Sequence, residues 1–316
     1  MNYQFKSAWY LPGAHLQTIV PALFRKPKNH FTRKTIITPD NDFLDIDLLL
    51  NNNDKLCIIT HGLEGSTCAQ YVLGLTKSLA NNGFDVLAWN NRGCSGRLNK
   101  AVRYYHSGLT EDLHLLIKYA TDELNYQQIY LVGFSVGGNI TLKYCGEQGL
   151  QLNHAIKKIA TVSVPVHLAS SARELDKAKN KIYLNRFLKS LKPKVISKIN
   201  QIPFNLNPSD VIKWKTFLEF DGNYTAPMYG FSSAQDYWDK SSSIHFLKFI
   251  QVQTLMISSL NDPFLAKECF PSDSEIGNQN IKTIYTNSGG HVGFCESFFS
   301  GNYFSEKSVL AFFTND

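Results

Sequence analysis

A serine stands between two glycines in the sequence Gly133-Phe134-Ser135-Val136-Gly137. The apolar run before it, residues 129–132, has β-branched members and is typical of a buried strand. The residues after it, with Ile140 and Leu142, are expected to form a helix. A sharp strand-to-helix turn strains the backbone of such a serine, exposes its hydroxyl, and needs small neighbours. Ser135 is therefore a candidate nucleophile; the alternative interpretation is an ordinary glycine-rich turn.

A serine hydroxyl becomes a nucleophile only beside a base, and that base needs an acid to orient it. Asp262 directly follows a late strand-like run, and His291 lies in a glycine-rich loop after the next such run. The glycines allow that loop to carry His291 back towards the serine. The order serine, acid, histidine is the order in which one large class of enzymes carries its triad. The sequence therefore predicts a triad of Ser135, Asp262 and His291, with Asp236 and Asp239 as alternative acids.

A second loop offers backbone donors to a developing negative charge. His61-Gly62-Leu63 comes directly after the strand-like run 55–60. A loop in this place supplies one N–H of an oxyanion hole, and the residue after the nucleophile supplies the other. We therefore predict the N–H groups of Leu63 and Val136 as the oxyanion hole. For His61, the favoured interpretation is a structural histidine packed under the loop.

The elements that must position these residues alternate between strand and helix. Such alternation predicts a mainly parallel sheet with helices on both faces, and an initial hairpin turning at 39–41 adds an antiparallel edge. This is the plan of the α/β-hydrolase fold, here with eight strands in a single domain spanning 1–316. Strands are expected at 34–38, 43–50, 55–60, 84–89, 129–132, 156–162, 252–258 and 281–286, and helices near 69–81, 110–124 and 304–313, besides the one after the serine.

Two segments depart from the alternation. Residues 1–30 are expected to form an irregular N-terminal arm that packs on the core. Residues 165–245, after the sixth strand, are mostly helical and aromatic in character, and the segment is too long for a connection, so it predicts a helical cap. An aromatic-rich tract in this cap indicates a pocket for medium or long acyl chains, the alternative being the cap's own small core. The tract comprises Phe217, Leu218, Phe220, Tyr224, Met228, Tyr229, Phe231, Tyr237 and Trp238.

Composition narrows the class of protein. With 43% hydrophobic and 18% charged residues, the 316-residue chain is globular with a sizeable core. The net charge of +6 is mild, and no basic stripe interleaved with aromatics indicates a nucleic-acid partner. The six cysteines form no C-x-x-C pair, and no signal peptide or long apolar run is visible, so we expect reduced thiols in a cytoplasmic protein. The predicted chemistry implies no metal and no cofactor, and the sequence carries no signal for an oligomeric state.

Basic residues crowd one part of the predicted cap. A helix of this kind could lie on an anionic lipid surface, which would make a peripheral membrane contact. The favoured interpretation is a solvated helix that packs its apolar side on the core. Between Arg173 and Lys198 the basic residues are Lys177, Lys179, Lys181, Arg186, Lys189, Lys192, Lys194 and Lys198, among Ile182, Phe187, Leu188 and Leu191.

Motifs along the whole chain resemble the YheT-like branch of the α/β-hydrolase superfamily, whose members include bacterial proteins and animal abhydrolase-domain proteins assigned as esterases or lipases. The resemblance implies the triad Ser135, Asp262 and His291, and hydrolysis of a small-molecule or lipid acyl ester through an acyl-enzyme. One alternative is an acyltransferase that passes the acyl group to an alcohol. Another is a catalytically silent binding protein, which the intact triad and its glycines disfavour. The matching segments are Trp9 with 15–18, 61–65, 92–96, 105–113, 133–139, 220–221, 224–227, 230–231, 261–264 and 289–294.

Overall fold

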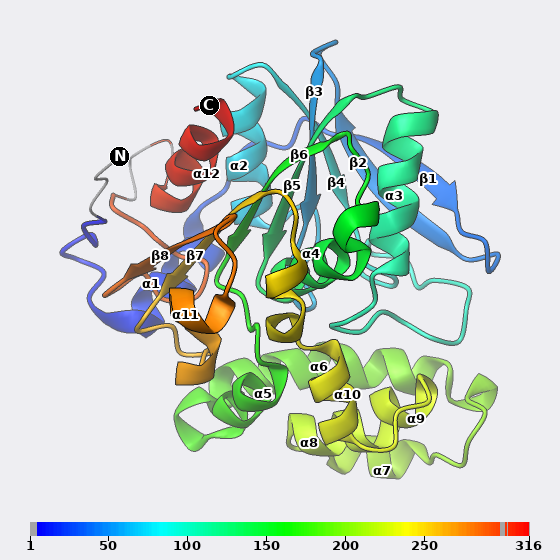
Figure 1. Ribbon diagram of the computed structural model, residues 1–316. Helices are drawn as coiled ribbons and strands as arrows, with labels where there is room; N and C mark the ends of the chain where they lie inside the picture. The colour runs from blue at the N-terminus through cyan, green and yellow to red at the C-terminus, as the bar shows by residue number, and fades with distance from the viewer. Residues whose placement is uncertain (1–4, 298–300, 302, 316) are drawn as a thin grey trace.

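An eight-stranded sheet runs through the computed structural model, which describes residues 5–297, 301 and 303–315 (Figure 1). The strand order is β1-β2-β4-β3-β5-β6-β7-β8. β1 pairs antiparallel with β2, and β2 pairs antiparallel with β4, whereas every later pair is parallel. The predicted mainly parallel sheet with an antiparallel edge is therefore confirmed. The strands are β1 (Thr32–Ile37), β2 (Phe43–Leu49), β3 (Lys55–Thr60), β4 (Phe84–Trp89), β5 (Gln128–Phe134), β6 (Ile156–Val162), β7 (Gln253–Ser259) and β8 (Ile281–Thr286).

Helices cover both faces of the sheet, which is why most residues of the central strands are apolar. Along β3, Leu56 and Ile58 belong to one hydrophobic core, and Cys57 and Ile59 belong to the other, as the alternation of side chains on a strand requires. α3 (Glu111–Asp122) and α4 (Val136–Gln148) pack on the first core, and α2 (Gln70–Ala80) and α12 (Phe304–Thr314) pack on the second. Figure 1 shows α2 and α12 side by side, away from α3 and α4.

A group of helices separates β6 from β7, and we call residues 165–245 the helical insertion. In Figure 1 these helices gather at the bottom of the view, apart from those that cover the sheet. A π-helical turn at Asp221–Thr225 interrupts them, and a short α11 (Asp273–Ile276) follows later, between β7 and β8. The insertion contains α5 (Leu168–Asp176), α6 (Lys181–Ser197), α7 (Pro208–Lys213), α8 (Phe217–Phe220), α9 (Ala226–Met228) and α10 (Ala234–Ser241).

The N-terminal segment is not irregular as predicted, because it contains α1 (Gly13–Phe24). Local signals for this helix are poor, since Pro21 lies inside it and its N-cap, Pro12, offers no side-chain cap. Tertiary contacts supply the missing stability. Gln17 is fully buried, and its side chain bonds to the backbone N–H and carbonyl of Cys295 at the other end of the chain.

No helix in the described part of the chain is both long enough and apolar enough to cross a membrane.

Candidate active site

Ser135 sits on the sharp turn between β5 and α4. Its backbone has φ 53° and ψ −124°, a conformation that residues other than glycine rarely adopt. A Cβ on Gly133 would come within 2.5 Å of the backbone of Gly137, and a Cβ on Gly137 would collide with carbonyl oxygens at the end of β3. Both glycines are therefore required by close backbone approach. The turn leaves the Ser135 hydroxyl beside the N-terminus of α4.

His291 lies between Ser135 and Asp262. Its Nε2 is 2.9 Å from the Ser135 Oγ, and its Nδ1 is 2.8 Å from Asp262 Oδ2. The Asp262 side chain is fully buried and also accepts the N–H of Phe264 at 2.9 Å. A buried carboxylate that accepts a hydrogen bond from the Nδ1–H group keeps the proton of the neutral imidazole on Nδ1. Nε2 then has a free lone pair that can take a proton from the serine. The structure therefore brings the three predicted residues into one hydrogen-bonded chain.

Several groups for which the sequence predicted no role hold His291 in place. The His291 N–H donates to the Thr18 hydroxyl of α1 at 2.8 Å, and the Val292 N–H donates to Ser163 at 3.0 Å. The Phe264 ring stacks on the imidazole with 4.0 Å between centroids. Gly290, with φ 61°, lets the loop pass close to α1. These contacts join distant segments, so no local pattern could have revealed them.

The alternative acids are engaged elsewhere. Asp236 on α10 pairs with Lys240 at 2.7 Å and caps its own helix end, and Asp239 is exposed and accepts the Gln235 amide. Neither carboxylate bonds to His291, so Asp262 is the acid that the geometry favours.

The loop after β3 borders the serine. Leu63 and Val136 line the same cavity as Ser135 and His291. His61 is buried beneath this loop, where its Nδ1 donates to the Gly62 carbonyl at 2.7 Å and its Nε2 accepts the N–H of Asn91 at 3.1 Å. Burial lowers the pKa of His61 to about 4, so its imidazole is neutral. These bonds agree with the structural interpretation of His61.

Glu64 ties this loop to the helical insertion. Its backbone has φ 51°, and its N–H donates to the Tyr105 hydroxyl at 2.8 Å. The Glu64 carboxylate is almost completely buried, pairs with Lys194 of α6 at 2.7 Å, and accepts the Ser190 hydroxyl of the same helix. Since Leu63 immediately precedes Glu64, the pair fixes the loop relative to α6.

Replacing Glu64 with glutamine should lower kcat by at least about tenfold, less than the ~100- to 1,000-fold typical of losing an oxyanion donor outright. The substitution removes the charge that Lys194 neutralises, leaves the lysine buried and unpaired, and loosens the loop. Steady-state kinetics and thermal unfolding should be measured together.

In the double variant Glu64→Gln/Lys194→Met the kcat loss should be less than additive, because the two side chains act as one unit. Lys189→Met is the matched control, since Lys189 is an exposed lysine on the same helix. Unchanged kcat in Glu64→Gln would contradict this role for the pair.

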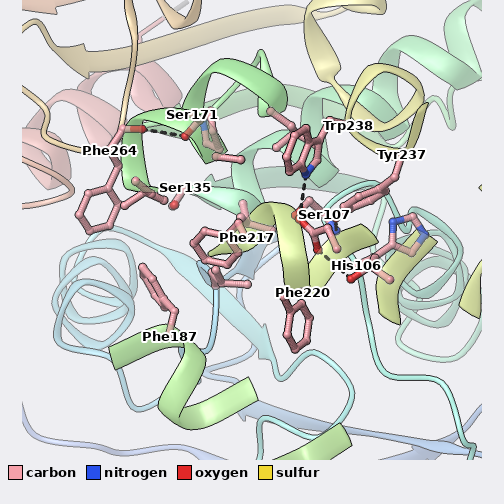
Figure 2. Close-up of a pocket in the computed structure, with 18 of the residues that line it drawn as sticks. His106, Ser107, Ser135, Ser171, Phe187, Phe217, Phe220, Tyr237, Trp238 and Phe264 are labelled. Atoms are coloured by element: carbon pink, nitrogen blue, oxygen red, sulfur yellow. Dashed lines mark hydrogen bonds between the residues drawn. The ribbon is translucent and has the colours of Figure 1, made fainter. Parts of the chain in front are cut away.

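The cavity beside Ser135 is walled mainly by the helical insertion (Figure 2). Of the predicted aromatic tract, Phe217, Phe220, Tyr237 and Trp238 reach this cavity. The other members do not: Tyr224 and Tyr229 line a separate small cavity, Leu218 is exposed, and Met228 and Phe231 pack on the core. The tract therefore serves both as pocket wall and as core. The remaining apolar wall consists of Leu63, Val136, Pro165, Leu168, Ala172, Leu175, Phe187, Leu191, Phe264 and Leu265.

The loop between β4 and α3 also contains both residues with a structural role and residues that line the cavity. Buried Arg92 pairs with Asp112 at 2.7 Å and with Asp42 at 3.3 Å, which makes it a structural tie. Residues 105–107 line the cavity and also tie the loop to its surroundings, since the Tyr105 hydroxyl accepts the Glu64 N–H at 2.8 Å and the Ser107 N–H donates to the Tyr237 hydroxyl at 2.9 Å.

The basic stretch of the insertion is not a uniform surface. Lys194 is paired with Glu64, and Lys198 is buried and donates to Asn99 at 2.9 Å. The apolar side of α6, with Tyr183 and Phe187, is buried. The helix therefore packs on the core, as the favoured interpretation expects.

A family model described as alpha/beta hydrolase fold matches residues 56–296. The chain belongs to the α/β-hydrolase family. This α/β hydrolase is 31% identical to YheT of Escherichia coli, a candidate esterase by name, over 91% of this chain and 87% of that protein. It is 25% identical to the phospholipase ABHD3 of Homo sapiens, over 92% of this chain and 73% of that protein. It is 26% identical to the monoacylglycerol lipase of Saccharomyces cerevisiae, over 78% and 57% of the two chains.

Solved structures agree on the fold. An esterase from Pyrococcus furiosus superposes with a TM-score of 0.55 at 20% identity, covering 83% of this chain and 84% of that one. Est1E from Butyrivibrio proteoclasticus superposes with a TM-score of 0.54 at 15% identity, covering 89% and 97%. The predicted α/β-hydrolase fold is confirmed, and the relatives' names support the predicted enzyme class, an esterase- or lipase-like carboxylic ester hydrolase.

Proposed function

We propose that this α/β hydrolase cleaves carboxylic esters through an acyl-enzyme in which Ser135 is the nucleophile. The observation that carries the proposal is the chain of hydrogen bonds from the Ser135 hydroxyl through His291 to the buried Asp262. His291 takes the hydroxyl proton as Ser135 attacks the ester carbonyl, and it then donates that proton to the leaving alcohol. Asp262 holds the imidazole in the required tautomer and stabilises its positive charge.

Water completes the reaction. His291 removes a proton from a water molecule that attacks the acyl-enzyme, and it returns this proton to the Ser135 oxygen as the acid leaves. In both steps negative charge develops on the former carbonyl oxygen. We assign its stabilisation to the N–H groups of Leu63 and Val136, and the position of Val136 at the N-terminus of α4 supports this assignment. No step requires a metal or an organic cofactor.

We further propose that the helical insertion is a cap on a single catalytic domain and that it determines the choice of substrate. Its side chains form most of the wall of the cavity that holds Ser135 and His291. An apolar pocket of this kind binds the hydrocarbon chain of an acyl group better than it binds a polar acyl group. The names of two relatives, a phospholipase and a monoacylglycerol lipase, favour lipid esters over the smallest esters.

Activity on p-nitrophenyl esters should rise from acetate towards medium or long acyl chains and then fall. Each methylene buried in the cavity contributes up to about 0.8 kcal/mol, or roughly fourfold in kcat/KM, until the cavity is full. The measurement is kcat/KM across the series from acetate to palmitate. A maximum at acetate would show that the aromatic wall is core and not an acyl pocket.

A matched pair of variants locates the acyl chain. Phe217→Ala enlarges the cavity and should move the optimum to longer chains. Leu218→Ala alters the next residue, which is 58% exposed, and should leave the optimum where it is.

The nearest rival is acyl transfer, in which an alcohol replaces water. The two reactions share the acyl-enzyme, so product analysis in the presence of a competing alcohol decides between them. Ester as the main product at low alcohol concentration would favour the transferase.

A further inference from the structure

The cavity wall contains one carboxylate that the proposed mechanism does not use. Asp221 begins the π-helical turn between α8 and α9 and lines the cavity together with Ser135 and His291. The residue is only 9% exposed, and the wall of its cavity includes the aromatic side chains of Phe217, Phe220 and Trp238. Turns of π type are frequent at functional sites, because they displace a side chain from the regular helix surface.

Within the described part of the chain, the carboxylate of Asp221 is bonded by neutral groups and paired with no cation. Its Oδ2 accepts the indole N–H of Trp238 at 2.8 Å, and its Oδ1 accepts the Thr225 hydroxyl at 2.7 Å. Both donors are neutral, and among the described residues no lysine, arginine or histidine lies within 4.0 Å of this carboxylate. Burial raises the pKa of Asp221 to about 6, so the group is ionised at neutral pH.

A second carboxylate adds to the negative potential. Asp176, at the end of α5, accepts the N–H groups of Phe217 and Leu218 at 2.8 and 3.4 Å, and its charge also raises the pKa of Asp221. Asp176 itself does not line the cavity. A buried anion with neutral partners is costly, and a positively charged ligand group would offset that cost.

We propose that Asp221, with the aromatic side chains of Phe220 and Trp238, forms a subsite for an ammonium group carried by the ester substrate. Carboxylates compensate such a cation, and aromatic faces attract it through their quadrupoles. A hydroxyl group would satisfy one free lone pair of Asp221 but would leave its charge uncompensated, so the cation fits better. The inference rests on the proposed function, because it deepens the substrate class of the same cavity.

Two esters that differ in one atom test the subsite. Octanoylcholine carries a trimethylammonium group, and 3,3-dimethylbutyl octanoate replaces its nitrogen with carbon, keeping the shape and removing the charge. The wild-type enzyme should favour the choline ester in kcat/KM by about tenfold or more, within the range of cation–π and ion-pair contributions. Asp221→Asn, which keeps the shape of the side chain, should abolish this preference by lowering kcat/KM for the choline ester much more than for the neutral ester.

A control variant tests whether the preference for the choline ester depends on Asp221 itself or on the negative charge of the insertion in general. Asp236→Asn removes a partly exposed carboxylate of the same insertion, paired with Lys240, and should leave the preference unchanged. A wild-type enzyme without preference, or equal losses on both esters in Asp221→Asn, would overturn the subsite and show that Asp221 only organises its turn. Hydrolysis of both esters by Ser135→Ala would instead overturn the proposed function.

The pH dependence provides a test that needs no variant. Asp176 of α5 and Tyr237 of α10 interact electrostatically with Asp221, and the other titratable groups that line its cavity are Tyr105, His106 and His291. Burial lowers the pKa of His106 to about 3 and raises that of Tyr237, so both stay neutral between pH 5 and 8. Glu219 on α8 and Lys240 on α10 do not line the cavity.

The ratio of kcat/KM for the choline ester to kcat/KM for the neutral ester cancels the pH effects that the two reactions share. In the wild type this ratio should rise as pH increases from 5 to 7, because Asp221 becomes charged over that window. The rise should persist in Asp176→Asn. A ratio that stays flat from pH 5 to 8 would overturn the assignment to Asp221.

Discussion

Replacing Ser135 with alanine should reduce ester turnover by about 10⁵-fold or more, as loss of the nucleophile does in other triads. The substitution removes one hydroxyl and keeps the Cβ, so the strained turn and the packing around it are retained. The measurement is kcat of the purified variant on its best p-nitrophenyl ester, together with thermal unfolding. A fluorophosphonate probe should label the wild type at Ser135 and should not label the variant.

Ser170→Ala is the matched control, because Ser170 lies on α5, donates to the His167 carbonyl, and does not line the cavity. It should retain near wild-type turnover. If Ser135→Ala keeps more than a tenth of the activity, or if the probe labels another residue, the nucleophile has been assigned wrongly.

Asp262→Asn should lower kcat by about 10⁴-fold, the cost of the corresponding change in another triad. The asparagine amide would donate to Nδ1 of His291, which drives the imidazole into the tautomer whose Nε2 carries a proton. That nitrogen could then no longer accept the proton of Ser135. The loss should appear in kcat and kcat/KM together, because the interaction matters in the transition state.

Asp236→Asn should have only a mild effect, since this carboxylate pairs with Lys240 and makes no bond to His291. The reverse ranking of the two aspartates would place the acid on the helical insertion. A small loss in both variants would show that the histidine is oriented by something other than a carboxylate.

The features that the sequence predicted well are local or periodic. Continuous apolar runs such as 55–60 predict buried parallel strands, because both faces of these strands are covered. The spacing of Gly133, Ser135 and Gly137 predicts the sharp turn, because only glycine tolerates the backbone contacts found there. The positions of Asp262 and His291 after late strands follow from parallel topology, which brings strand ends to one edge of the sheet.

What only the tertiary structure decided depends on contacts between distant segments. α1 is helical although its prolines argue against a helix, because its buried face packs on the loop that carries His291. The aromatic tract divides between cavity and core according to which way each short helix faces, and no periodicity spans helices of this length. The pairing of Glu64 with Lys194 and the neutral hydrogen-bond partners of Asp221 have the same origin. A charged residue has no local signal for its partner, since that partner is chosen by the packing of the helical insertion against the sheet.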